Sequence, residues 1–106
     1  MLVCRVETKK AIYVMPDGDL VAAESEAMRR ELRDCSWQGM ERLVLDLARV
    51  RTIDNVGIET IIDACNRVCQ GGGELIIENA TRDLKDLFWL IQYDRRLTIS
   101  RTGWPG

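Results

Sequence analysis

The sequence predicts a single α/β domain built on a mixed, mostly parallel β-sheet covered by helices. Short apolar runs rich in β-branched residues alternate with longer stretches whose apolar residues recur every three or four positions. Such alternation after an initial hairpin indicates parallel strands joined by helical crossovers. The length of 106 residues suits one domain core and is too short for two. We expect residues 1–102 to form this domain and residues 103–106 a short tail.

The first half of the chain predicts two strands, a helix and a third strand. Residues 2–7 and 11–15 are β-branched runs separated by a polar turn, which is typical of a hairpin. After turn residues at 16–18, apolar side chains at near-helical spacing predict an amphipathic helix that carries Leu20, Ala27, Met28, Leu32 and Cys35. Residues 36–41 form a loop. Residues 43–47 are an almost continuous apolar run, as in a strand buried on both faces.

The second half continues the alternation and completes the order β-β-α-β-α-β-α-β. Asp54 offers a side-chain oxygen to the free N–H groups of a helix whose apolar face consists of Ile58, Ile61, Ile62, Cys65 and Cys69. Three glycines at 71–73 end this helix before a buried strand at 74–78. Thr81 caps a third helix, with one face made of Leu84, Leu87, Phe88 and Ile91. Residues 97–100 form a last short strand.

The composition excludes several kinds of chemistry. There is no histidine, which excludes Ser-His-Asp and Cys-His catalysis and His-ligated metals. No nucleophile–base pair can be assembled, so we expect no enzyme activity. A net charge of −2 without a basic cluster argues against nucleic-acid binding. We expect a cytoplasmic protein without direct membrane insertion, because the chain shows neither a signal peptide nor a membrane-span pattern.

The cysteines are expected to be reduced and partly buried, because they lie inside apolar patterns and form no CxxC pair: Cys4, Cys35, Cys65 and Cys69. Cys65 and Cys69 are four residues apart on a predicted helix and could alternatively offer two ligands to a soft metal. Two further ligands would then be needed from elsewhere. We predict no metal site and no cofactor.

Two segments raise the question of anion binding. A phosphate-binding loop follows a strand and opens a helix, whereas the glycines at 71–73 follow a helix and open a strand. They are therefore interpreted as a helix cap and turn. Residues 52–57 have the required order, so the positive end of a helix dipole lies there. This segment is either a capped helix start in which Gly57 allows close packing, or a sensor site where Asn55 and Val56 bind a nucleotide or another small anion.

Several motifs together resemble the STAS domain of bacterial anti-sigma factor antagonists. The stretch at 43–50 carries Leu-Asp-Leu, and Ile53-Asp54-x-x-Gly57-Ile58 follows it. Further matches are Gly18-Asp19-Leu20, Gly72-Gly73 before an apolar strand, and Leu84-x-x-Leu87-Phe88. The resemblance covers nearly the whole chain. It implies a STAS fold and a non-catalytic function in signal transduction and transcription regulation.

The resemblance also implies that the usual phosphoswitch is absent. In phosphoswitch members, the pair between the aspartate and the glycine contains a serine or threonine that the partner anti-sigma kinase phosphorylates to block binding. Here that pair is Asn55-Val56, and Val56 occupies the acceptor position. The family also tends to carry an aspartate after glycine-x-leucine, where this chain has Val21. Thr52 and Thr60 are either substitute phosphoacceptors or ordinary polar residues.

The resemblance implies a partner-binding surface composed of Asp54, Asn55, Val56, Gly57, Glu59 and Thr60. Its partner would be an anti-sigma factor or another signalling protein. The alternative is a STAS subunit that docks on a nucleotide-binding subunit in a phospholipid or ABC-type transport assembly.

A second binding surface is predicted on the outer face of the third helix. At about 100° per residue, Trp89 lies roughly 150° from the apolar face, and Tyr93 lies one turn further along. Tryptophan and tyrosine are enriched at interfaces. We therefore expect this outer face to bind the partner or a second copy of the chain as a homodimer.

Overall fold

The computed structural model describes residues 3–92 and 97–99. The observed order of elements matches the prediction: β1 (Val3–Glu7), β2 (Ala11–Pro16), α1 (Ala23–Arg33), β3 (Arg42–Asp46), α2 (Asn55–Gln70), β4 (Glu74–Glu78), α3 (Arg82–Gln92) and β5 (Leu97–Ile99). Tyr93 and the predicted tail at 103–106 lie outside the described residues.

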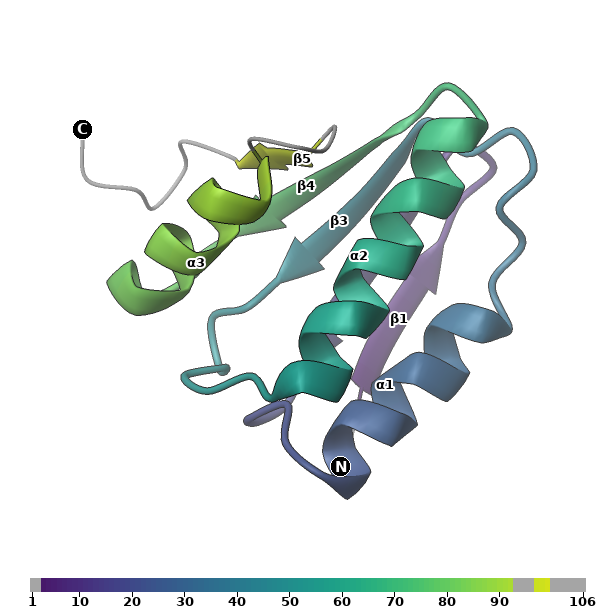
Figure 1. Cartoon of the computed structure of the whole chain (residues 1–106). Helices are drawn as coiled ribbons and strands as arrows, with labels where there is room; N and C mark the ends of the chain where they lie inside the picture. The colour runs from purple at the N-terminus through teal and green to yellow at the C-terminus, as the bar shows by residue number, and fades with distance from the viewer. Residues whose placement is uncertain (1–2, 93–96, 100–106) are drawn as a thin grey trace.

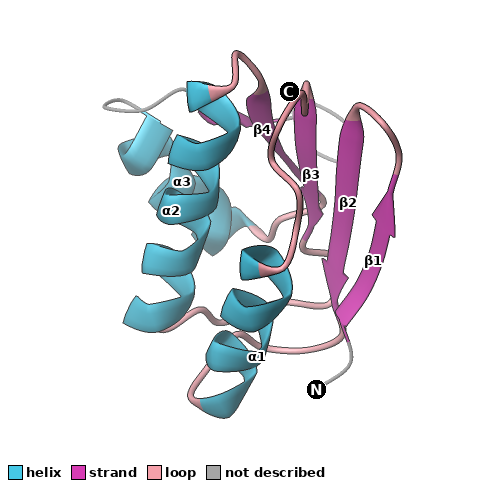
Figure 2. Ribbon diagram, turned by 90° about the vertical axis from the view of Figure 1, so that its right-hand side faces the viewer, coloured by secondary structure: helices cyan, strands magenta, loops and turns pink. Residues whose placement is uncertain are grey.

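The strands form one five-stranded sheet in the order β1-β2-β3-β4-β5. The hairpin strands β1 and β2 are antiparallel, and every later pair is parallel, which confirms the predicted mixed sheet. The three helices all lie on one face of this sheet (Figure 2). In register across β2, β3 and β4, the buried side chains of Ile12, Leu43 and Leu75 form one row of the core.

One strand prediction was only partly right. In β3, Leu43, Val44 and Leu45 are all buried, as expected for this central strand. In β4, however, Ile76 is only half-buried between the buried Leu75 and Ile77. A buried strand was predicted here, but side chains alternate along a strand, so Ile76 faces away from the helices that cover Leu75 and Ile77.

The buried face of α2 also differs from the prediction. Thr60 and Ala64 are buried, whereas Ile58 and Ile62 are half-buried. Figure 1 shows the reason: α2 lies between α1 and α3, and it packs against α1 as well as against β3 and β4. Contact with a neighbouring helix widens the buried face and turns it toward α1.

The predicted first helix includes residues that lie outside α1. Leu20 precedes the helix and forms an isolated parallel bridge with Ile53, and Cys35 follows the helix end. Both side chains are nevertheless buried in the core. The apolar spacing therefore identified core residues correctly but extended the helix beyond its ends.

The glycines after α2 form the expected turn. The N–H groups of Gly72 and Gly73 donate to the carbonyl oxygens of Cys69 and Val68, both at 2.9 Å. A Cβ on Gly73 would stand 2.5 Å from the backbone oxygen of Met40, so only glycine fits there without a shift of the neighbouring chain. No disulfide joins the cysteines whose side chains the structure describes, which are Cys35, Cys65 and Cys69.

Candidate functional site

The candidate site is organised by the carboxylate of Asp54, which precedes α2. Its Oδ1 accepts hydrogen bonds from the N–H of Gly57 at 2.9 Å and from the hydroxyl of Ser25 at 2.7 Å. Its Oδ2 accepts from the N–H of Ala22 at 2.6 Å. The first of these bonds confirms the predicted N-cap of α2. The other two join the same carboxylate to the start of α1.

These hydrogen bonds lower the pKa of Asp54 below its usual value. The Ser25 hydroxyl has the largest effect, followed by the backbone N–H groups of Gly57 and Ala22. Each donor stabilises the ionised carboxylate. Asp54 therefore carries its negative charge at neutral pH, at the positive end of the α2 dipole.

A second aspartate holds the loop before α2. Oδ1 of Asp19 accepts from the N–H groups of Arg51 at 2.8 Å and Thr52 at 3.2 Å. The backbone of Leu20 continues this contact, because its N–H donates to the Thr52 carbonyl and its carbonyl accepts from the Asp54 N–H. The start of α2 is thus tied to the loop before α1 by both side chains and backbone.

Gly57 allows these segments to approach closely. A Cβ at this position would lie 2.6 Å from Cγ2 of Ile53, 3.2 Å from Oγ of Ser25 and 3.3 Å from Cβ of Leu20. The first distance is shorter than carbon atoms tolerate without a shift. The predicted role of Gly57 in close packing is therefore confirmed.

The expected binding residues differ in their exposure. Asn55 and Glu59 are exposed, and Val56 is half-buried in the first turn of α2. Thr60 is only 6% exposed, and its Oγ1 donates to the carbonyl oxygen of Val56 at 2.8 Å. Asp54, Asn55, Val56 and Gly57 thus form one contiguous turn, whereas the Thr60 side chain turns inward.

The two candidate phosphoacceptors are therefore not equivalent. Thr60 lies on the buried face of α2, where α1 packs against that helix. Thr52 is exposed in the loop before α2. Of the two hydroxyls, the one on Thr52 is open to a modifying enzyme in this conformation.

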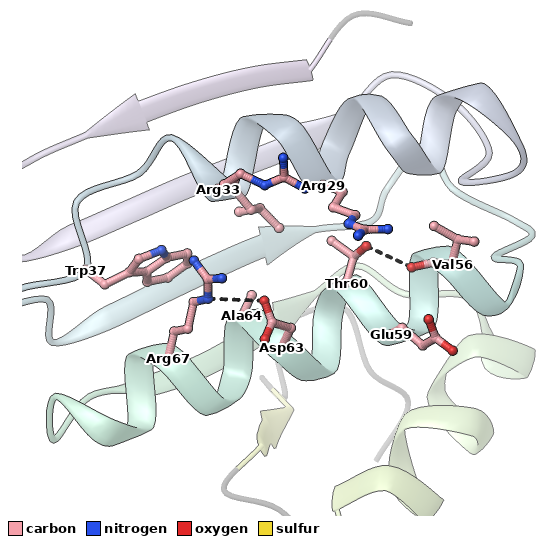
Figure 3. A pocket seen from close by; sticks show the side chains of 10 residues that line it. Arg29, Arg33, Trp37, Val56, Glu59, Thr60, Asp63, Ala64 and Arg67 are labelled. Carbon is pink, nitrogen blue, oxygen red and sulfur yellow. Dashed lines mark hydrogen bonds and ion pairs between the residues drawn. The ribbon is translucent and has the colours of Figure 1, made fainter.

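An open groove of about 310 Å³ runs between α1 and α2 beside this turn. Arg29 and Arg33 extend from α1, Arg67 extends from α2, and the Trp37 indole lies at one end, with Val56 at the other (Figure 3). The sequence did not predict this groove, because its walls come from helices far apart in the chain.

The outer face of α3 carries large apolar side chains. Trp89 is 67% exposed and Leu90 is 74% exposed, whereas Leu84 and Phe88 are buried. The predicted orientation of Trp89 is thus confirmed. The Thr81 hydroxyl accepts from the Leu84 N–H at 3.3 Å, which confirms the predicted cap of α3.

The sequence did not reveal the role of Ser25. Its side chain is fully buried, and its hydroxyl reaches Asp54 across 29 positions of sequence. A serine near a helix start is usually explained by local capping. Only its position among apolar residues on the inner side of α1 could have indicated a buried partner.

Neither a metal-binding group nor a membrane-spanning helix is found in the described part of the chain. No group of three cysteine, aspartate or glutamate side chains there is placed to hold a metal ion. Within the same residues, no helix is long and apolar enough to cross a membrane.

Comparisons with known proteins identify the family of this fold. The STAS domain family model matches residues 5–103. No curated protein sequence gives a significant match.

Three solved structures show the same fold. The anti-sigma factor antagonist SpoIIAA in its unphosphorylated form has a TM-score of 0.75 at 14% identity, over 93% of this chain and 87% of that one. The Bacillus cell fate determinant SpoIIAA in its phosphorylated form has a TM-score of 0.73 at 14% identity, over 93% and 91% of the two chains. The murine Slc26a9 anion transporter has a TM-score of 0.68 at 18% identity, over 89% of this chain and 16% of the transporter.

Proposed function

Because this chain belongs to the STAS domain family, we propose that it is a non-catalytic, cytoplasmic module that binds a signalling protein through the start of α2. The partner is an anti-sigma factor or a protein with an equivalent role. The observation that supports the proposal is the set of hydrogen bonds to Asp54, which hold the turn that carries Asn55 and Val56 in a fixed conformation. A surface already held in its binding conformation loses little entropy when a partner docks.

The mechanism of this module is competitive sequestration. The chain occupies its partner and thereby changes what else the partner can bind, so no covalent step is needed. Val56 has no hydroxyl, and binding is therefore not switched by phosphorylation at this position. Control passes to the abundance of the chain, to a different partner, or to a second interface.

That second interface is the outer face of α3 (Arg82–Gln92), where Trp89 contacts the partner or a second copy of this chain. Trp89 is 67% exposed, and the adjacent Leu90 adds further exposed apolar surface. Burial of such an aromatic side chain commonly contributes a large part of the binding free energy.

The proposal is tested by affinity capture from the source cell with three forms of the chain. Wild type and Gln70→Arg should capture the same signalling protein, and Asn55→Arg should lose it. Both substituted residues are exposed, and they lie at opposite ends of α2, so the Gln70 variant is a matched control. Equal capture by the wild type and Asn55→Arg would show that the start of α2 is not the docking surface.

A second candidate function is that of a STAS subunit in a transport assembly. The missing hydroxyl at Val56 favours it, because a partner that is not a kinase requires no phosphoacceptor. In this case the captured protein is a nucleotide-binding ATPase subunit, and capture of an anti-sigma factor would exclude this alternative.

A further inference from the structure

The groove between α1 and α2 has a distinct chemistry at the end near Trp37. We propose that this end binds an acidic segment of the partner protein, with one carboxylate held by Arg33 and Arg67 and an adjacent apolar side chain packed on Trp37 and Ala64. The proposal rests on the proposed function, because it defines the chemistry of the partner that docks beside the start of α2.

The groove is continuous with the proposed docking surface. Val56, Glu59 and Thr60 line it at one end, and Trp37 lies at the other (Figure 3). Its volume of about 310 Å³ is at the lower limit of small ligand sites. A partner that covers Asn55 and Val56 can therefore extend a short segment into the groove.

The arginines along the groove retain free hydrogen-bond donors. Among the described residues, Arg33 has no ion-pair partner and is exposed. Arg67 contacts Oδ2 of Asp63 through Nε at 3.1 Å, which leaves its two terminal nitrogens available. Arg29 makes only an exposed contact of 3.4 Å with Glu26. Guanidinium groups with free terminal nitrogens suit the paired oxygens of a carboxylate.

The acidic residues of the groove determine where the carboxylate binds. Glu59 lies beside Val56, at the end opposite Trp37 (Figure 3). Its charge repels an anion at that end. Asp63 is paired with Arg67 and is therefore partly neutralised. The attractive region for a carboxylate is consequently between Arg33 and Arg67, beside the indole.

The apolar wall favours a peptide over a free inorganic anion. Leu32 and Ala64 form the nearly buried floor of the groove, and the half-buried Trp37 supplies most of its accessible apolar surface. A phosphate ion would use the arginines and leave this wall in contact with water. An acidic residue next to leucine or phenylalanine uses both surfaces.

The proposal is tested by NMR titration of the full chain with the capped hexapeptide acetyl-Ala-Glu-Leu-Glu-Leu-Ala-amide. Saturable shifts are expected at the Trp37 indole N–H and the Ala64 amide. Arg33→Glu should weaken binding by about tenfold or more, because an attraction becomes a repulsion. Arg30→Glu is the matched control, since Arg30 is an exposed neighbour on α1 that does not line the groove, and it should bind almost normally.

Three results would overturn the proposal. One is the absence of saturable shifts at millimolar peptide, and another is equal binding of a peptide in which both glutamates are lysine. The third is the same set of shifts with inorganic phosphate or ATP at lower concentration, which would make the groove a small-anion site. Affinity capture of the partner separates this proposal from the proposed function. If Arg33→Glu captures the partner fully and Asn55→Arg does not, the groove proposal is wrong and the docking surface at the start of α2 is retained.

Discussion

Replacement of Gly57 by alanine tests the close packing at the start of α2. Alanine is favoured over glycine inside a helix by about 1 kcal/mol. Its methyl group, however, would stand 2.6 Å from Cγ2 of Ile53 and close to Ser25 and Leu20. Overpacking of this kind, with the shifts of neighbouring atoms that it forces, lowers the free energy of unfolding by about 1–3 kcal/mol. We therefore expect Gly57→Ala to lower the free energy of unfolding by about 1 kcal/mol, as the difference of these two effects.

A double-mutant cycle separates the two effects. Ile53→Ala removes the Cγ2 methyl that the new Cβ meets. In that background, Gly57→Ala should raise the free energy of unfolding by about 0.5–1 kcal/mol, since mainly the helix preference remains. The four forms are compared by urea unfolding, with midpoints and slopes analysed together.

The decisive result is that Gly57→Ala lowers the free energy of unfolding in the wild type but raises it in the Ile53→Ala variant. Gly18→Ala serves as the control, because a Cβ at Gly18 meets no atom within 4 Å. If Gly57→Ala stabilises the wild type and the Ile53→Ala variant equally, the close approach of these segments does not depend on glycine. The argument for a tightly packed docking turn would then be wrong.

Three further predictions concern the charge of Asp54, the missing hydroxyl and the aromatic surface. Because hydrogen bonds lower the folded-state pKa of Asp54, the stability advantage of the wild type over Asp54→Asn should be complete above the ordinary pKa of 3.8 and disappear as the pH falls below it. Urea unfolding across this pH range measures the difference in the free energy of unfolding between the two forms. A difference that does not change with pH would contradict the role of the hydrogen bonds to Asp54. Val56→Ser should accept phosphate from an anti-sigma kinase that binds the chain, whereas mass spectrometry of the wild type treated with the same kinase should find no stoichiometric phosphate on any residue from Thr52 to Thr60. Refusal of the serine variant by a bound kinase means that the pocket has changed more widely. Trp89→Ala should weaken association by about tenfold or more while the free energy of unfolding changes by less than about 0.5 kcal/mol. A strongly lowered unfolding midpoint with unchanged association would place Trp89 outside the interface.

The order of elements and the cap of α2 followed from interactions that are local in sequence. Asp54 and Gly57 are three positions apart, so the cap could be predicted from residue types alone. The buried strand β3 followed from its continuous apolar run, and the exposed Trp89 followed from the periodicity of side-chain direction in a helix. These predictions needed no knowledge of how the elements pack.

The remaining features depend on which elements become neighbours. Asp54 also binds Ala22, 32 positions away, and no local pattern marks that pair. Thr60 is buried because α1 packs against α2, and Ile76 is half-buried on the sheet face that carries no helix. The groove exists only where α1 places Arg33 opposite Arg67 of α2 (Figure 3). Residue type and spacing set the direction of a side chain within its own element, but its neighbours across a crossover are set by the packing of whole helices against the sheet.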